Sequence, residues 1–329
     1  MADNKTHNRW LYIPWGIAAV VLLSYLMLWR YGAAEMKSAV SDWVEDQRAA
    51  GVEVSHGALK ADGFPFFLRL HIEDPYIAAP ETGAWRTERL TIDALPYDLN
   101  RLIFSTRTEQ FVSLAGHGDW RMSAEDFRIS IANDKRRDWV FAATIGGATA
   151  RRDEDGATAS VGSLILDLSP EETDKTILTL SVLATEAQVT AGGKNIALDK
   201  LQTVVAASEA YALADPDLWR KAGGALQIKG VFAQLEEARF AAAGTLRLDG
   251  EGRPQGDLRT EIIAPAPFVH LLGDAGVIAP EDVESAAASL TLASIAAGGK
   301  LTAPIEFKDG AAHVAGVRLT GVASGRANP

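Results

Sequence analysis

The chain has 329 residues, 47% of them hydrophobic and 23% charged, which is enough apolar material for a substantial folded core. Its formal net charge of −11 opposes binding to the phosphate backbone of nucleic acids. The absence of cysteine excludes disulfide frameworks, thiol nucleophiles and cysteine-ligated metal centres.

Residues 1–9 form a short polar head, and the next 20 residues, WLYIPWGIAAVVLLSYLMLW from Trp10 to Trp29, contain no charge. A helix of that length spans about 30 Å, the thickness of a bilayer's hydrocarbon core. Trp10 and Trp15 at one end and Trp29 at the other are typical of the aromatic belts of a spanning helix. We therefore predict an uncleaved transmembrane signal-anchor at 10–29. Cleavage after the small residues at 32–34 is the alternative.

We predict that this anchor lies in the inner membrane, with the N-terminus in the cytoplasm and the bulk of the chain in the periplasm. Four basic and two acidic residues precede residue 38, so residues 38–329 carry a net charge of −13. A body this acidic is repelled by the anionic lipids of the cytoplasmic leaflet.

Residues 33–50 have apolar positions at helical spacing, and Gly51 is a natural stop. This pattern predicts an amphipathic helix. It would be either a stalk that carries the following domain or a helix that covers one end of a sheet.

From residue 52 the apolar period changes to two, which predicts strands with one buried face. Phe66, Leu68, Leu70 and Ile72 alternate with polar residues or Phe67, and Leu90 and Ile92 repeat the pattern. Similar alternation recurs near 127–131, 164–168, 178–182, 246–248 and 305–307. Four Asp-Gly pairs favour hairpin turns. The fold class expected is mainly β: a transmembrane helix and then an elongated, curved antiparallel sheet at 52–329, with a weak possible boundary near 210–224.

Short helices are predicted at 265–273 and 280–297, and a third near 215–219. Pro280 suits the first position of a helix, and the acidic residues Glu281, Asp282 and Glu284 suit its first turn.

No phosphate-binding loop, dinucleotide fingerprint, nucleophile elbow or His-Glu-x-x-His motif is present. His71 with Glu73, and His117 with Asp119, would suit a metal only if those segments met, and a solvated strand face and a Gly-His-Gly-Asp turn explain them better. Adjacent acidic residues point to different faces of a strand, which argues against a carboxylate pair. We therefore predict no catalytic residue, no metal and no cofactor.

Several segments together resemble the family called domain of unknown function 2125, found in alphaproteobacterial envelopes. They are the anchor, the helix with Trp43, the segment VSHGALKADGFPFFLRLHIEDP with its Gly63-Phe64-Pro65-Phe66 stretch, LTIDALP at 90–96, and PIEFKDGAAHVAGVRL at 304–319. The hairpin around Gly63 is more loosely similar to AsmA-type envelope proteins. That second resemblance implies an elongated β-structure with an apolar groove that organises lipid.

Three functions are compatible with the sequence. The first is a membrane-anchored periplasmic protein that binds, shields or organises lipid or another amphiphile without catalysis, with the inward strand residues Phe66, Leu68, Leu70, Ile72, Leu90 and Ile92 as its binding face. The second is a closed-core structural module of the envelope, with a protein partner and no small ligand. The third is an extracytoplasmic hydrolase.

Overall fold

A computed structural model describes residues 9–79, 81–314 and 317–321, with side chains described for 12–79 and 81–314. The chain divides into two compact units, residues 1–115 and 116–329. Antiparallel strands dominate both units, as the alternating sequence predicts.

The first unit begins with one helix, α1 (Arg9–Ala49), which runs without interruption through both segments predicted to be helical. The strands that follow are β1 (Glu53–Ser55), β2 (Leu59–Asp62), β3 (Leu68–Glu73), β4 (Tyr76–Ala79), β5 (Gly83–Thr87), β6 (Arg89–Leu95), β7 (Asp98–Ser105) and β8 (Gln110–Leu114). They pair in the orders β2-β3-β6-β7 and β1-β4-β5-β8.

The core of the first unit lies between α1 and the β2-β3-β6-β7 strands. Ala33 on the helix packs with Leu68 and Ala94, and the half-buried Met36 and Val40 pack against Leu70 and its neighbours. The amphipathic stripe of 33–50 therefore covers the sheet, which is the second of the two roles considered for it.

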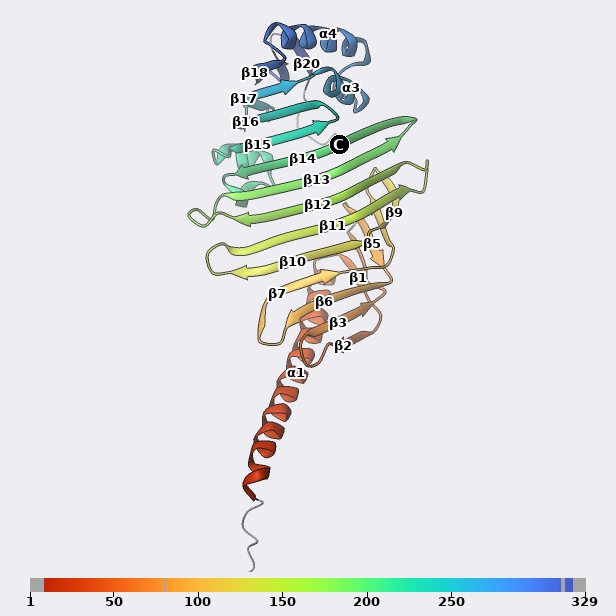
Figure 1. Cartoon of the computed structure of the whole chain (residues 1–329), viewed down its shortest axis with the longest axis vertical. Helices are drawn as coiled ribbons and strands as arrows, with labels where there is room; N and C mark the ends of the chain where they lie inside the picture. The colour runs from red at the N-terminus through yellow and green to blue at the C-terminus, as the bar shows by residue number, and fades with distance from the viewer. Residues whose placement is uncertain (1–8, 80, 315–316, 322–329) are drawn as a thin grey trace, which may run out of the picture. The chain divides into compact units, whose positions relative to one another are not determined.

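The second unit is a run of long strands in sequence order, which Figure 1 shows side by side from β10 to β18. Its strands are β9 (Gly118–Ser123), β10 (Asp126–Asp134), β11 (Asp138–Arg152), β12 (Thr158–Pro170), β13 (Leu178–Ala191), β14 (Lys194–Ala207), β15 (Leu226–Leu235), β16 (Ala238–Leu248), β17 (Pro254–Ile263), β18 (Lys300–Lys308), β19 (Ala311–Val314) and β20 (Val317–Gly321).

Its helices are η1 (Ala210–Ala212), α2 (Pro216–Lys221), α3 (Ala266–Asp274) and α4 (Pro280–Ala296). All three predicted short helices are confirmed. Asp215 caps α2 by accepting hydrogen bonds from the backbone N–H groups of Asp217 and Leu218. Pro280 stands in the first turn of α4, where its missing N–H costs little.

One core cluster lies in the second unit, between the two helices α3 and α4 and one face of strands β15 to β19. Val269 from α3 and Leu290 from α4 pack with Ile228, Leu258 and Ile305 from the strands. The two helices thus cover one end of the sheet.

Candidate functional site

α1 contains the stretch that could cross a membrane. The helix is long and apolar enough from Tyr12 onward to span a bilayer, and none of its most apolar window is buried by protein. Trp15 is exposed, whereas Trp29 is half-buried. Trp10 belongs to the helix, but its side chain is outside the described residues, as is the polar head at 1–8.

The ligand-binding face predicted in the first unit is occupied by the protein's own helix. Leu68 and Leu70 are 1% and 0% exposed, and Ile72 and Ile92 are also buried. Leu90 is half-buried in the same cluster, which α1 covers through Met36 and Val40. These five side chains therefore do face inward, and together with α1 they form a core rather than an open groove.

The prediction that Phe66 faces inward is wrong. Its side chain is 75% exposed, because β3 begins only at Leu68 and Phe66 lies in the turn before it. The alternation of apolar residues simply continues beyond the end of the strand.

The second unit carries a larger apolar surface, on strands β10 to β14. Three rows of directly paired residues cross these five strands on one side of the sheet. We call these fifteen residues the apolar face: Ile131, Phe141, Leu168, Leu180 and Val205; Ile129, Ala143, Leu166, Val182 and Thr203; Phe127, Ile145, Leu164, Ala184 and Leu201. Thr203 is their one polar member, and none is charged. At ordinary strand spacings the apolar face measures about 19 Å across the strands and about 13 Å along them.

The opposite side of the same five strands has a different character. Asp126, Arg128, Asp167 and Lys200 lie there among small, hydroxylated and a few large apolar residues such as Ile165 and Leu183. Charged residues on one side and none on the other are typical of an antiparallel sheet with one solvent-facing side and one apolar side.

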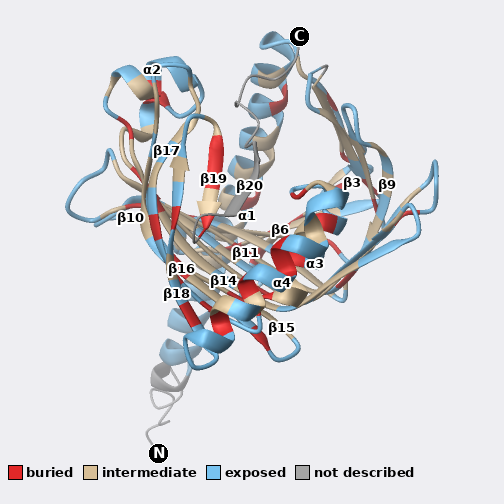
Figure 2. Cartoon of the chain, turned by 90° about the horizontal axis from the view of Figure 1, so that it is seen from above, coloured by how far each residue is buried: buried red, intermediate tan, exposed pale blue. Residues whose placement is uncertain are grey.

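Side chains of the described residues leave the apolar face half-exposed. Only its two alanines, Ala143 and Ala184, are buried, and Ile131 is 44% exposed. Apart from Val205, none of its members packs with a buried core cluster of the described residues. Figure 2 shows the same contrast, since the long strands are mainly tan while α3 and α4 carry red segments.

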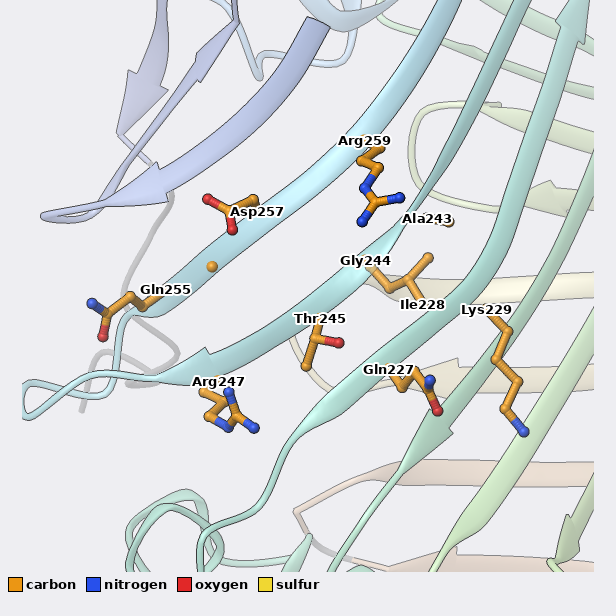
Figure 3. A pocket seen from close by; sticks show the side chains of 11 residues that line it. Gln227, Ile228, Lys229, Ala243, Gly244, Thr245, Arg247, Gln255, Asp257 and Arg259 are labelled. Atoms are coloured by element: carbon orange, nitrogen blue, oxygen red, sulfur yellow. The ribbon is translucent and has the colours of Figure 1, made fainter.

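A second candidate is a polar hollow of about 790 Å³ on strands β15 to β17. Arg247, Arg259, Lys229 and Asp257 line it, on the side of the sheet opposite α3 and α4. Figure 3 shows that these four side chains spread in different directions rather than toward a common point. Lys229 is also committed to Glu171, with 2.5 Å between Nζ and Oε1. The hollow therefore lacks the convergence that catalysis or tight anion binding requires.

Groups that could perform acid–base or metal chemistry do not gather elsewhere in the described part of the chain. No cluster of three histidine or acidic residues suited to a metal occurs there. His71 lies 3.1 Å from the hydroxyl of Thr91 through Nδ1 and 3.8 Å from a carboxylate oxygen of Asp62 through Nε2, which are ordinary surface contacts.

The acidic residues at 153–155 form the turn of the β11–β12 hairpin. There Arg152 makes a bidentate pair with Asp155 and, with the N–H of Ala157, holds the pKa of that carboxyl well below its usual range. A carboxylate kept charged in this way stabilises a turn and is poorly suited to proton transfer.

Comparison with known families supports the resemblance that the sequence indicates. Residues 29–323 match the model of the family described as uncharacterized protein conserved in bacteria, domain of unknown function 2125, and the chain belongs to this family. No curated protein and no solved structure gives a significant match.

The sequence predicts several of the strands that carry the apolar face, but it does not predict that this face stays partly exposed. The alternation at 127–131, 164–168 and 178–182 was visible, and it has the same form as the alternation in β3 that α1 covers. The distinguishing feature is the position of the covering helices, which no local pattern in the strands encodes.

Proposed function

We propose that this chain is a single-pass membrane protein whose apolar face binds the acyl chains of a lipid or a similar amphiphile, without catalysis. The observation that carries the proposal is a half-exposed surface of fifteen residues with no charge, in a chain whose N-terminal helix is suited to cross a membrane. Contiguous apolar patches of this kind are uncommon on soluble proteins unless something covers them.

Lipid is the occupant that best suits this surface. Binding of an acyl chain is non-directional and depends on apolar area, which leucine, isoleucine and phenylalanine side chains supply. A protein partner would be expected to add hydrogen-bond and charge complementarity within the patch, where the apolar face offers only the hydroxyl of Thr203.

The orientation proposed is the one that the charge distribution favours. The −13 charge of residues 38–329 disfavours the anionic cytoplasmic surface, so the β-rich units lie in the periplasm and the polar head in the cytoplasm. Because the chain has no native cysteine, a single cysteine at the exposed Tyr211 gives a clean test. A membrane-impermeant maleimide should label it once the outer membrane is permeabilised, and labelling only after lysis of the inner membrane would refute this orientation.

Photo-crosslinking tests the lipid site. The full chain is placed in phosphatidylcholine nanodiscs that contain a lipid with a photoreactive acyl chain, and adducts are mapped by mass spectrometry. Leu166→Glu should remove adducts from β11 to β13. The matched variant Ile165→Glu changes the preceding residue, on the opposite side of the same strand, and should retain them.

Adducts confined to α1 would overturn the proposal, since lipid would then reach the anchor but not the apolar face. Capture of a protein at a photoreactive residue placed at 166, with no lipid adduct, would instead support the closed structural module.

A further inference from the structure

The Gly63-Phe64-Pro65-Phe66-Phe67 loop and the Pro96-Tyr97 turn have no part in the proposed lipid site, and they expose aromatic rings. Phe66 is 75% and Tyr97 78% exposed, and Phe64 and Phe67 are also exposed. No residue from 63 to 67 is charged. Several large aromatic rings on two neighbouring turns are a costly surface to leave in water.

Strand register places the two turns side by side. Leu68, at the start of β3, pairs with Ala94, near the end of β6, so the loop before β3 and the turn after β6 emerge at the same end of the sheet. The exposed Glu88 precedes β6 at the opposite end, about 20 Å away along the strand.

The loop is fastened to α1 at the end of the predicted span. The indole Nε1 of Trp29 donates a hydrogen bond of 2.8 Å to the carbonyl oxygen of Phe67, and the hydroxyl of Tyr25 donates one to the carbonyl oxygen of Pro65. The ring of Phe64 lies 6.0 Å from that of Tyr25 and 5.8 Å from that of Trp29, measured between centroids.

This level of the helix is apolar on its free side. Met27 and Leu28, between the two anchoring aromatics, are exposed, and the first charged residue beyond them is Arg30. The loop therefore lies beside the last turn of the segment expected to be in the bilayer, where aromatic side chains are preferred.

The hydrogen bonds that Tyr25 and Trp29 donate to the loop are suited to a position at the membrane interface. Loop carbonyl groups that enter an apolar medium lose their contacts with water, and each unpaired group there costs free energy. Tyr25 and Trp29 provide donors for two of them, so the loop can approach lipid with these groups satisfied.

We infer that the 63–67 loop and the 96–97 turn insert their aromatic side chains into the membrane interface, and so form a second membrane contact beside α1. The partner is the lipid surface itself. This inference rests on α1 crossing the bilayer and is independent of lipid binding at the apolar face.

Depth-dependent quenching tests the inference with the full chain. Single-cysteine variants Phe66→Cys, Tyr97→Cys and the control Glu88→Cys are labelled with an environment-sensitive fluorophore and reconstituted into phosphatidylcholine vesicles. Labels at 66 and 97 should emit at shorter wavelength than the label at 88, be quenched by lipids brominated on their acyl chains, and resist iodide. The label at 88 should show the reverse.

Equal access of iodide to all three positions would overturn the inference. Failure of the chain to float with the vesicles would overturn it together with the anchor. Loss of lipid adducts at the apolar face, with the quenching pattern intact, would refute only the lipid site. Because Phe66 and Tyr97 are exposed, all three labelled proteins should melt at the same temperature as the unlabelled chain.

Discussion

Replacement of Leu70 by alanine should loosen the first unit, whereas the same replacement at Phe66 should not. Leu70 is fully buried in β3 and packs with Ile72 and Ile92 beneath α1. Truncating a leucine in such a place removes its burial and leaves a cavity, at a cost of about 3 kcal/mol. Phe66 is exposed in the preceding turn, where truncation usually costs less than about 0.5 kcal/mol.

Hydrogen exchange of the full chain measures this difference without requiring reversible unfolding. At about 1.4 kcal/mol for each factor of ten, Leu70→Ala should accelerate exchange of the protected amides in β3 and β6 by about two orders of magnitude. Phe66→Ala should leave them unchanged. Equal acceleration by the two variants, or none by either, would show that β3 does not face α1 as described.

Three further outcomes follow from contacts elsewhere. Gly63→Ala should cost about 2 kcal/mol and increase proteolysis of the loop, because φ is +97° and an added Cβ would lie 2.8 Å from the carbonyl oxygen four residues on. Trp29→Phe removes the donor to the carbonyl oxygen of Phe67 and should reduce stability by about 1 kcal/mol, which is measured as a lower melting temperature in nanodiscs. Trp15→Phe should leave the melting temperature unchanged. Lys229 lowers the pKa of Glu171 below its ordinary value of 4.5 through a hydrogen bond. Because the folded-state pKa is the lower of the two, the pair stabilises the fold fully above the ordinary pKa that Glu171 has in the unfolded chain. This contribution, under about 1 kcal/mol, is lost as pH falls through the depressed pKa of the folded state. In Glu171→Gln the melting temperature should therefore fall less steeply as the pH is lowered into the acid range. An unchanged dependence on pH would contradict this assignment.

The sequence predicts elements well where one local rule decides them. Pro280 with acidic residues after it marks the start of α4, and the uncharged run up to Trp29 marks the apolar part of α1. Alternation in β3 correctly assigns Leu68, Leu70 and Ile72 to one face.

The position of the candidate site could not be predicted in the same way. Leu70 and Leu166 stand in equally regular alternation, but α1 covers the first and no core cluster of the described residues includes the second. Which strands a helix covers depends on contacts between distant parts of the chain. The prediction for Phe66 was wrong for a different reason. Phe66 continues the alternation of Leu68, Leu70 and Ile72, but it lies in the turn at 64–66, and the strand begins only after that turn.

The continuity of α1 makes its helical phase a physical link between the proposed membrane contact and the core of the first unit. Trp29, Ala33, Met36, Val40 and Val44 recur at intervals of three or four residues and form one stripe toward the protein. One alanine inserted after Gly32 would rotate the part beyond it by about 100° relative to Trp29. The loop and the sheet could then no longer both pack against the helix, so exchange in β3 should accelerate.

The same insertion after Val21 is the matched control. Val21 is exposed in the predicted span, and the stripe begins beyond it, so the relation between Trp29 and Val40 is preserved. This variant should keep wild-type exchange in β3 while lengthening the apolar segment by about 1.5 Å. If both insertions were equally harmless, the helix would not fix the sheet and the loop in a common phase. The aromatic loop would then have no fixed depth in the membrane.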